Sequence, residues 1–209
     1  SRARMSPIMS FANTDMAFKD DLLVAGNYHG FNMYKIKKDG IPELISSVVC
    51  PGGQGDVSVV GDFLIMSVEH NRSRLDCGSM GVGRDASPER FRGIRIFDIS
   101  DRANPIQVGA VQTCRGSHTH SVVTGPTINN KIIIYNSGTA SVRDEDEMEQ
   151  CIGNIPGDNR TALFRIDVIE VPISDPSKAK IVSSPAVFAD PETGVLGGLW
   201  IGGDHGDDT

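Results

Sequence analysis

The stretch TDMAFKDDLLVA at residues 14–25 returns 41 residues later as GDVSVVGDFLIM at residues 55–66, without a gap. Each copy reads as a short strand, a tight turn at an aspartate and an apolar strand. A looser third copy begins at residues 120–123, has a longer turn at residues 125–130 and continues through residues 131–135. Self-similarity of this kind predicts a repeat architecture.

Two further strands follow each copy. They begin at residues 30–36 (GFNMYKI), 93–101 (GIRIFDISD) and 167–176 (DVIEVPISDP). Each unit therefore contains four strands over roughly 42 residues, which is typical of a β-propeller blade. No stretch has a sustained helical periodicity, so the sequence predicts an all-β fold.

We expect one partial β-propeller domain of four-stranded antiparallel blades over residues 1–209. Its three blades are expected at about residues 12–50, 55–114 and 118–188, with the start of a fourth at about 198–209. Closing a propeller takes at least about four blades, so we expect further residues or partner chains to complete the ring. The beginning at Ser1 and the last residues, 202–209, are unlike ordinary domain ends. We therefore expect a processed or partial chain that has lost a signal peptide.

The spacing of the units locates their insertions. The connection between the second and third strands is Tyr28-His29 in the first unit, about residues 69–92 in the second and about residues 138–160 in the third. In a four-stranded meander this connection leaves from the same end as the link to the next unit. Both insertions are therefore expected on one face, where loops on a rigid scaffold commonly build a site.

The composition excludes several classes of protein. A chain of 209 residues with 39% hydrophobic and 22% charged residues is neither a disordered tail, a collagen-like rod nor a coiled coil. It contains no apolar run of roughly 18 residues, so no transmembrane segment is expected in it. Lys and Arg number 20 against 27 Asp and Glu, and a net charge of -7 without a basic face argues against nucleic-acid binding.

Residues 30–36 and 93–105 (GIRIFDISDRANP) resemble the LVIVD-repeat family, in which an apolar strand ends in a turn of the DISDP type. The resemblance covers about residues 12–190, and the second unit matches best. The first unit departs from it, because Lys35-Ile36-Lys37-Lys38 stands in place of an Asp-Ile-Ser-Asp run. The resemblance implies a β-propeller that is exported to the periplasm, the cell surface or the extracellular space, and it names no reaction.

Four cysteines fall in two equivalent pairs of positions. Cys50 and Cys114 lie 64 residues apart at the ends of fourth strands, whereas Cys77 and Cys151 lie in the two insertions. Three disulfide pairings are possible, and repeat symmetry favours Cys50–Cys77 with Cys114–Cys151. The alternatives are four buried thiols, or a zinc site, which the absence of a short Cys spacing disfavours. Disulfides would indicate an oxidising compartment.

Two sequons, Asn71-Arg72-Ser73 and Asn159-Arg160-Thr161, also fall in the insertions. They make Asn71 and Asn159 candidate glycosylation sites if the source glycosylates proteins, although so short a motif also arises by chance.

His118-Thr119-His120 is the candidate metal motif. Residues two apart on a strand project to the same side, and together with Asp56 and with His205 or Asp204 they would supply copper or zinc ligands. The segment weakly resembles the histidine-rich corners of selenium-binding-protein and methanethiol-oxidase propellers, which hold copper. The alternative is that His120 and Asp56 form structural hydrogen bonds.

The acidic run DEDEME at residues 144–149 offers oxygen ligands for calcium. It lacks the alternating spacing of a dedicated calcium loop, and a solvated loop tip is the favoured interpretation.

Two hypotheses about function follow. The first is an exported propeller without defined catalysis that binds protein partners, or joins a larger extracellular or membrane-associated assembly, through disulfide-braced loops. The second is a metal-binding propeller enzyme with its site at the channel mouth.

Overall fold

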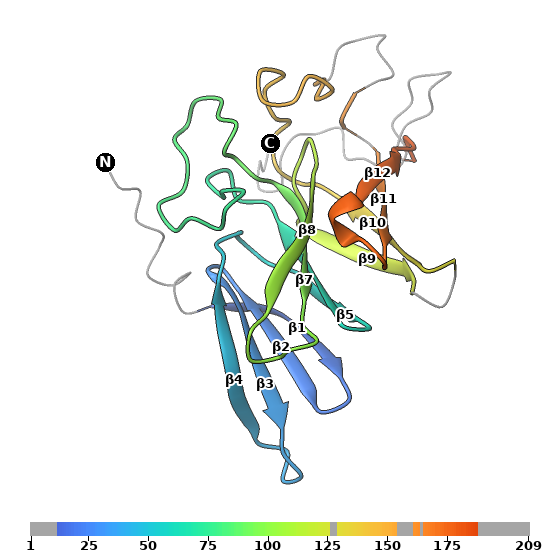
Figure 1. Ribbon diagram of the computed structural model, residues 1–209. Coiled ribbons are helices and arrows are strands. Elements are labelled where there is room, and N and C mark those ends of the chain that lie inside the picture. The colour runs from blue at the N-terminus through green and yellow to red at the C-terminus, as the bar shows by residue number, and fades with distance from the viewer. Residues whose placement is uncertain (1–11, 126–128, 154–160, 164, 188–209) are drawn as a thin grey trace, which may run out of the picture.

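The computed structural model describes residues 12–125, 129–153, 161–163 and 165–187. These residues form three four-stranded antiparallel sheets and, among them, no α-helix (Figure 1). The all-β prediction is therefore confirmed, and so is the four-strand unit. The expected fourth unit, at about residues 198–209, lies outside the described residues.

In every sheet the strands are neighbours in the order in which they occur in the chain. The first sheet contains β1 (Asn13–Lys19), β2 (Leu22–Asn27), β3 (Gly30–Ile36) and β4 (Pro42–Val49). The second contains β5 (Val57–Val60), β6 (Phe63–Val68), β7 (Gly93–Asp98) and β8 (Ile106–Gln112). The third contains β9 (Thr119–Thr124), β10 (Lys131–Ser137), β11 (Asp167–Pro172) and β12 (Lys180–Ser183), and the short 3-10 helix η2 (Pro176–Lys178) precedes its last strand.

The hairpins between the first two strands of each sheet use residues that tolerate a positive φ. Asp20 has φ 54° and Gly61 has φ 59°, and each occupies the first position of a two-residue turn. Tight hairpin turns of this kind need a positive φ to match the twist of the strands. The third hairpin is longer and ends in Asn129 and Asn130, which also have positive φ.

The sheets pack face to face through two hydrophobic clusters. The first cluster joins sheets one and two, and within it the rings of Phe31 and Phe97 meet edge to face with centroids 5.0 Å apart. The second cluster joins sheets two and three. In β6, Leu64 and Met66 belong to the first cluster and Ile65 to the second, so the middle sheet is covered on both sides. Alternating strand residues thus reach both neighbours.

A polar contact recurs between the first strands of consecutive sheets. A carboxylate oxygen of Asp15 accepts a hydrogen bond from the backbone N–H of Val57 at 3.0 Å. In the same way, a carboxylate oxygen of Asp56 accepts one from the backbone N–H of His120 at 2.6 Å. At the other end of the sheets, the Ser46 hydroxyl donates to the carbonyl of Arg102. These contacts fix how each sheet sits on the next one.

Gly93 begins β7 where two backbones approach closely. It has φ +147°, and a Cβ built there would lie 2.0 Å from the carbonyl oxygen of Val111. Gly30 begins β3 in the same way, with φ +143° and the same distance to the Val48 oxygen. We expect Gly93→Ala to lower the free energy of unfolding by about 3 kcal/mol, because both the backbone conformation and the space require glycine.

Urea denaturation followed by circular dichroism measures this effect. Gly83→Ala is the matched control, because a Cβ there meets no atom within 4 Å and its stability should change by less than about 0.5 kcal/mol. If both variants unfold at the same urea concentration, the close approach of the Gly93 and Val111 backbones does not make glycine necessary for stability.

Candidate functional site: the loop platform

The two long connections lie together at the upper side of Figure 1. Residues 69–92 join β6 to β7, and residues 138–166 join β10 to β11, so the second connection runs six residues past the expected end at residue 160. We call residues 69–92 and 138–153 the loop platform. It stands at the same end of the sheets as the short link Tyr28-His29 between β2 and β3.

Two disulfides brace the platform. Cys50 is bonded to Cys77, and Cys114 is bonded to Cys151, which is the pairing that repeat symmetry favours. Each bond ties the corner after a sheet's last strand to an inserted connection. Ala162 is buried against Cys114 and Cys151, and Val142 and Met148 pack on this small cluster. The four cysteines are thus used in holding the loops.

Arg95, in the middle of β7, fixes the first connection to the second sheet. The side chain is fully buried, and its guanidinium donates to the carbonyls of Arg74 and Leu75 and to the side chain of Gln107. The same guanidinium lies over the ring of Phe91, 4.4 Å from the ring centre. Burial lowers the pKa of Arg95 to about 10. Its polar contacts are the compensation that a buried cation needs.

Glu147 joins the two connections to each other. One carboxylate oxygen accepts from Arg90, which belongs to the first connection, and the other accepts from Arg143 of the second connection at 2.9 Å. The side chains of Glu147 and Arg143 are each only 1% exposed, and that of Arg90 is 9% exposed. The solvated-tip prediction was therefore wrong for Glu147, although it holds for the exposed residues 144–146.

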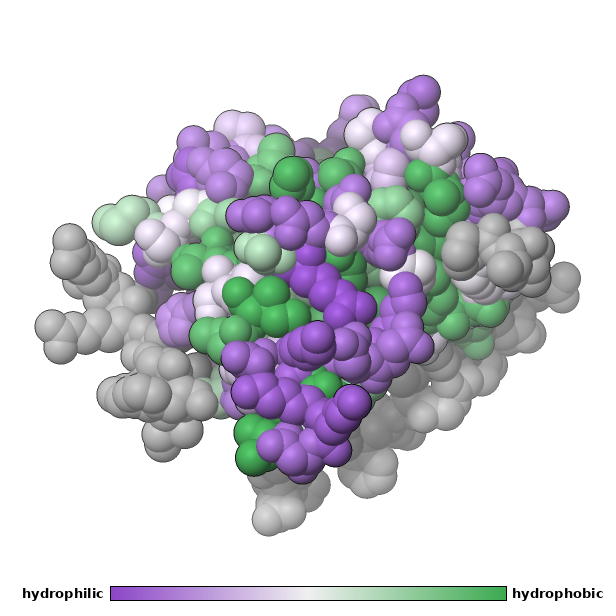
Figure 2. Space-filling view, turned by 60° about the horizontal axis from the view of Figure 1, so that its bottom comes forward, coloured by the Kyte–Doolittle hydropathy of each residue, from purple (hydrophilic) through white to green (hydrophobic). Residues whose placement is uncertain are grey.

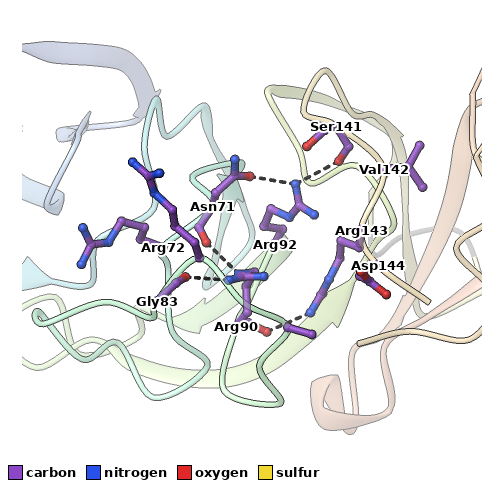
Figure 3. Close-up of a pocket in the computed structure, with 11 residues that line it drawn as sticks. Asn71, Arg72, Gly83, Arg90, Arg92, Ser141, Val142, Arg143 and Asp144 are labelled. Atoms are coloured by element: carbon purple, nitrogen blue, oxygen red, sulfur yellow. Dashed lines mark hydrogen bonds between the residues drawn. The ribbon is translucent and has the colours of Figure 1, made fainter. Parts of the chain in front are cut away.

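An arginine-lined cavity of about 430 Å³ opens between the connections (Figure 3). Five arginines line it: Arg72, Arg84, Arg90, Arg92 and Arg143. Arg92 donates from one terminal nitrogen to the side-chain oxygen of Asn71 and to the carbonyl of Ser141, both of which are neutral. Burial, followed by the nearby charge of Arg143, lowers the pKa of Arg92 to about 10. The sequence offered no motif for this cavity, since its arginines come from two loops without a common spacing.

Asn71, a candidate for glycosylation, is part of the loop framework. Its backbone carbonyl accepts from Arg90 at 2.8 Å, and its side-chain oxygen accepts from Arg92 at 2.9 Å. Ser73, the third residue of the sequon, is 2% exposed. The other candidate, Asn159, lies outside the described residues.

The candidate metal ligands separate into two contacts. His120 is buried, with its Nδ1 2.9 Å from the hydroxyl of Ser67 and 3.1 Å from a carboxylate oxygen of Asp56. His118 precedes the first residue of β9, and its Nδ1 lies 2.7 Å from a carboxylate oxygen of Glu69. Among the described residues no three His, Cys, Asp or Glu side chains are grouped as a metal site. Asp204 and His205 lie outside the described residues.

Asp56 is partly buried and contacts His120. Burial alone raises the pKa of this carboxyl, but its contacts with His120 outweigh the burial and hold the pKa below its ordinary value. The structure therefore brings Asp56 and His120 into contact through Nδ1 of the imidazole, and the metal site stays a prediction.

Two smaller cavities lie at the same end of the sheets. One, of about 290 Å³, is lined by residues that include Tyr28, His70, Arg72 and Met80. The other, of about 210 Å³, lies at the starts of the first strands of the sheets, beside Asp56 and His118. Arg72 lines both the 290 Å³ cavity and the arginine-lined cavity, so these two cavities adjoin each other on the platform.

No protein-family model matches this chain, and no curated protein matches it. None of the helices in the described part of the chain is long and apolar enough to cross a membrane.

Proposed function

We propose that this chain is part of an exported β-propeller that works as a binding and assembly module, with the loop platform as its binding face. The observation that carries the proposal is that a disulfide fixes each inserted connection to a sheet corner and Glu147 joins the two connections, so that they form one braced surface with the arginine-lined cavity between them. Loops held rigid on a scaffold bind with less loss of conformational freedom than mobile loops do.

The propeller assignment has three supports. Consecutive sheets pack face to face with repeated carboxylate-to-backbone contacts at Asp15 and Asp56. The resemblance of residues 93–105 to the LVIVD-repeat family implies the same architecture. The outer face of the first sheet leaves Met16 and Phe18 about 60% exposed, which suits packing against a further blade. Closure by additional residues or partner chains is part of the proposal.

Export is supported by the two disulfides, which persist in oxidising compartments. The alternative function, a metal-dependent enzyme at the channel mouth, has less support. In the part of the chain that the structure describes, no three His, Cys, Asp or Glu side chains are grouped as a metal site, and His118 and His120 contact different carboxylates.

The test measures saturable binding of the labelled, purified chain to cell-envelope protein from its source organism. Met80, on the platform, is 71% exposed, and Ile41, in the turn between β3 and β4 at the opposite end, is 60% exposed. Figure 2 brings that opposite end forward and shows separate hydrophobic patches among hydrophilic side chains. We expect Met80→Asp to weaken binding roughly tenfold or more, since an interface anchor is replaced by a charge.

Ile41→Asp is the matched control and should bind like the unaltered chain. Binding that is insensitive to Met80→Asp but lost with Ile41→Asp would move the binding face to the other end of the sheets and refute the proposal. A complete lack of saturable binding would refute it as well.

A further inference from the structure

The arginine-lined cavity contains more positive charge than its own carboxylates neutralise. Counted over the whole residue, Arg90, Arg92 and Arg143 are 7%, 3% and 4% exposed, and the carboxylate of Glu147, whose side chain is 1% exposed, lies among them. Asp144 also lines the cavity but is exposed. Buried charges are ordinarily paired, because an unpaired ion in a protein interior is strongly disfavoured. The site is thus short of negative charge in a chain whose net charge is -7.

The donors of these arginines are unequally used. All three guanidinium nitrogens of Arg90 donate to described residues, and so do those of Arg143. Arg92 donates only from one terminal nitrogen, and its buried Nε has no hydrogen-bond partner among the described residues. Arg90 and Arg143 therefore have a structural role in the cavity lining, whereas Arg92 retains N–H donors that a ligand could accept from.

Two more cations stand at the cavity. Arg72 and Arg84 line it, and neither side chain forms a hydrogen bond or ion pair with a described residue. Guanidinium groups match carboxylate and phosphate oxygens in a planar, two-pronged geometry, which makes arginine the usual choice for oxyanion recognition. A volume of about 430 Å³ is within the range of pockets that hold small organic ligands.

We propose that this cavity binds a small oxyanion that carries at least two negative charges, a phosphate or a dicarboxylate, with Arg92, Arg72 and Arg84 as its recognition residues. The inference rests on the proposed function, because it names the ligand class of one hollow of the platform. A dianion neutralises the excess charge of the buried guanidiniums and accepts hydrogen bonds from donors that the protein leaves unused.

The experiment titrates the purified chain, with both disulfides intact, by isothermal titration calorimetry at constant ionic strength. Inorganic phosphate and succinate are the two probes, and chloride is the reference anion. Binding of phosphate alone identifies the ligand class as a phosphate, and binding of succinate alone identifies it as a dicarboxylate. Either result supports the proposal. We expect Arg84→Gln and Arg92→Gln each to weaken binding by roughly tenfold or more, as charge-assisted hydrogen bonds are lost.

An exposed recognition residue and a matched control make the test decisive. Arg84 is exposed, so Arg84→Gln removes a recognition residue without threatening the fold. Arg102→Gln removes the same charge at the opposite end of the sheets, beside Asp21, and should leave binding unchanged. The proposal is overturned if neither probe binds, if the heat of binding is no greater than that of chloride, or if all variants bind equally. Such a failure would leave the Met80-dependent binding of the platform untouched, so the two proposals fail separately.

Discussion

Glu147→Gln is expected to lower the free energy of unfolding by about 3–5 kcal/mol, the loss typical of removing one partner from a buried ionic network. The substituted amide keeps the shape of the side chain but removes the charge that both Arg90 and Arg143 require. Because the three side chains are nearly inaccessible to water, solvent cannot replace the carboxylate. Two guanidinium groups would then remain buried in the platform beside Arg92 without a counter-ion.

Urea denaturation followed by circular dichroism checks this expectation. Glu145→Gln is the matched control, because Glu145 belongs to the same acidic run but is exposed, and its loss should change stability by less than about 0.5 kcal/mol. Glu147→Asp retains the charge and should fall between Glu147→Gln and the unaltered chain. Equal stabilities for Glu145→Gln and Glu147→Gln would show that the two connections do not depend on this carboxylate.

The double variant Cys114→Ser/Cys151→Ser is expected to lose about 3–4 kcal/mol of stability, as the chain-entropy description of disulfides predicts. The bond spans 37 residues, so its removal restores much conformational freedom to the unfolded chain. Serine hydroxyls would also replace sulfur in the cluster that buries Ala162.

Reduction of the unaltered protein supplies the comparison for this variant. A reductant should destabilise the unaltered chain through both bonds, but the double variant only through Cys50–Cys77. The effect of reductant should therefore be smaller in the variant. If reductant destabilises both proteins equally, the Cys114–Cys151 bond does not stabilise the fold.

The features that were predictable from sequence are those that depend on local periodicity and on repeat spacing. Strand alternation and turn residues such as Asp20 and Gly61 specify hairpins through neighbouring residues alone. The offset of 64 residues between Cys50 and Cys114 placed both cysteines at equivalent corners, and this symmetry favoured the pairing that the structure shows.

The contents of the platform were not predictable, because they depend on contacts between residues distant in the chain. Glu147 stands in an acidic run that is typical of a solvated tip, but Arg90, 57 residues away, and Arg143 both donate to its carboxylate and keep it buried. Arg95 alternates with Ile94 and Ile96 as a solvent-facing residue would, but the first connection folds over it. The arginine-lined cavity likewise brings together arginines from two separate loops, so no short sequence motif could reveal it.

The paired residues at the two ends of the β2–β3 and β6–β7 connections show how far the length of this connection can vary. Asn27 pairs with Gly30 across two residues, and Val68 pairs with Gly93 across residues 69–92, yet both pairs lie at the same place in their sheets. Closing the longer link costs only about 2 kcal/mol more, because closure entropy grows with the logarithm of length. The strand ends thus keep the same pairing and register, so loops of very different length can connect them without changing the sheet.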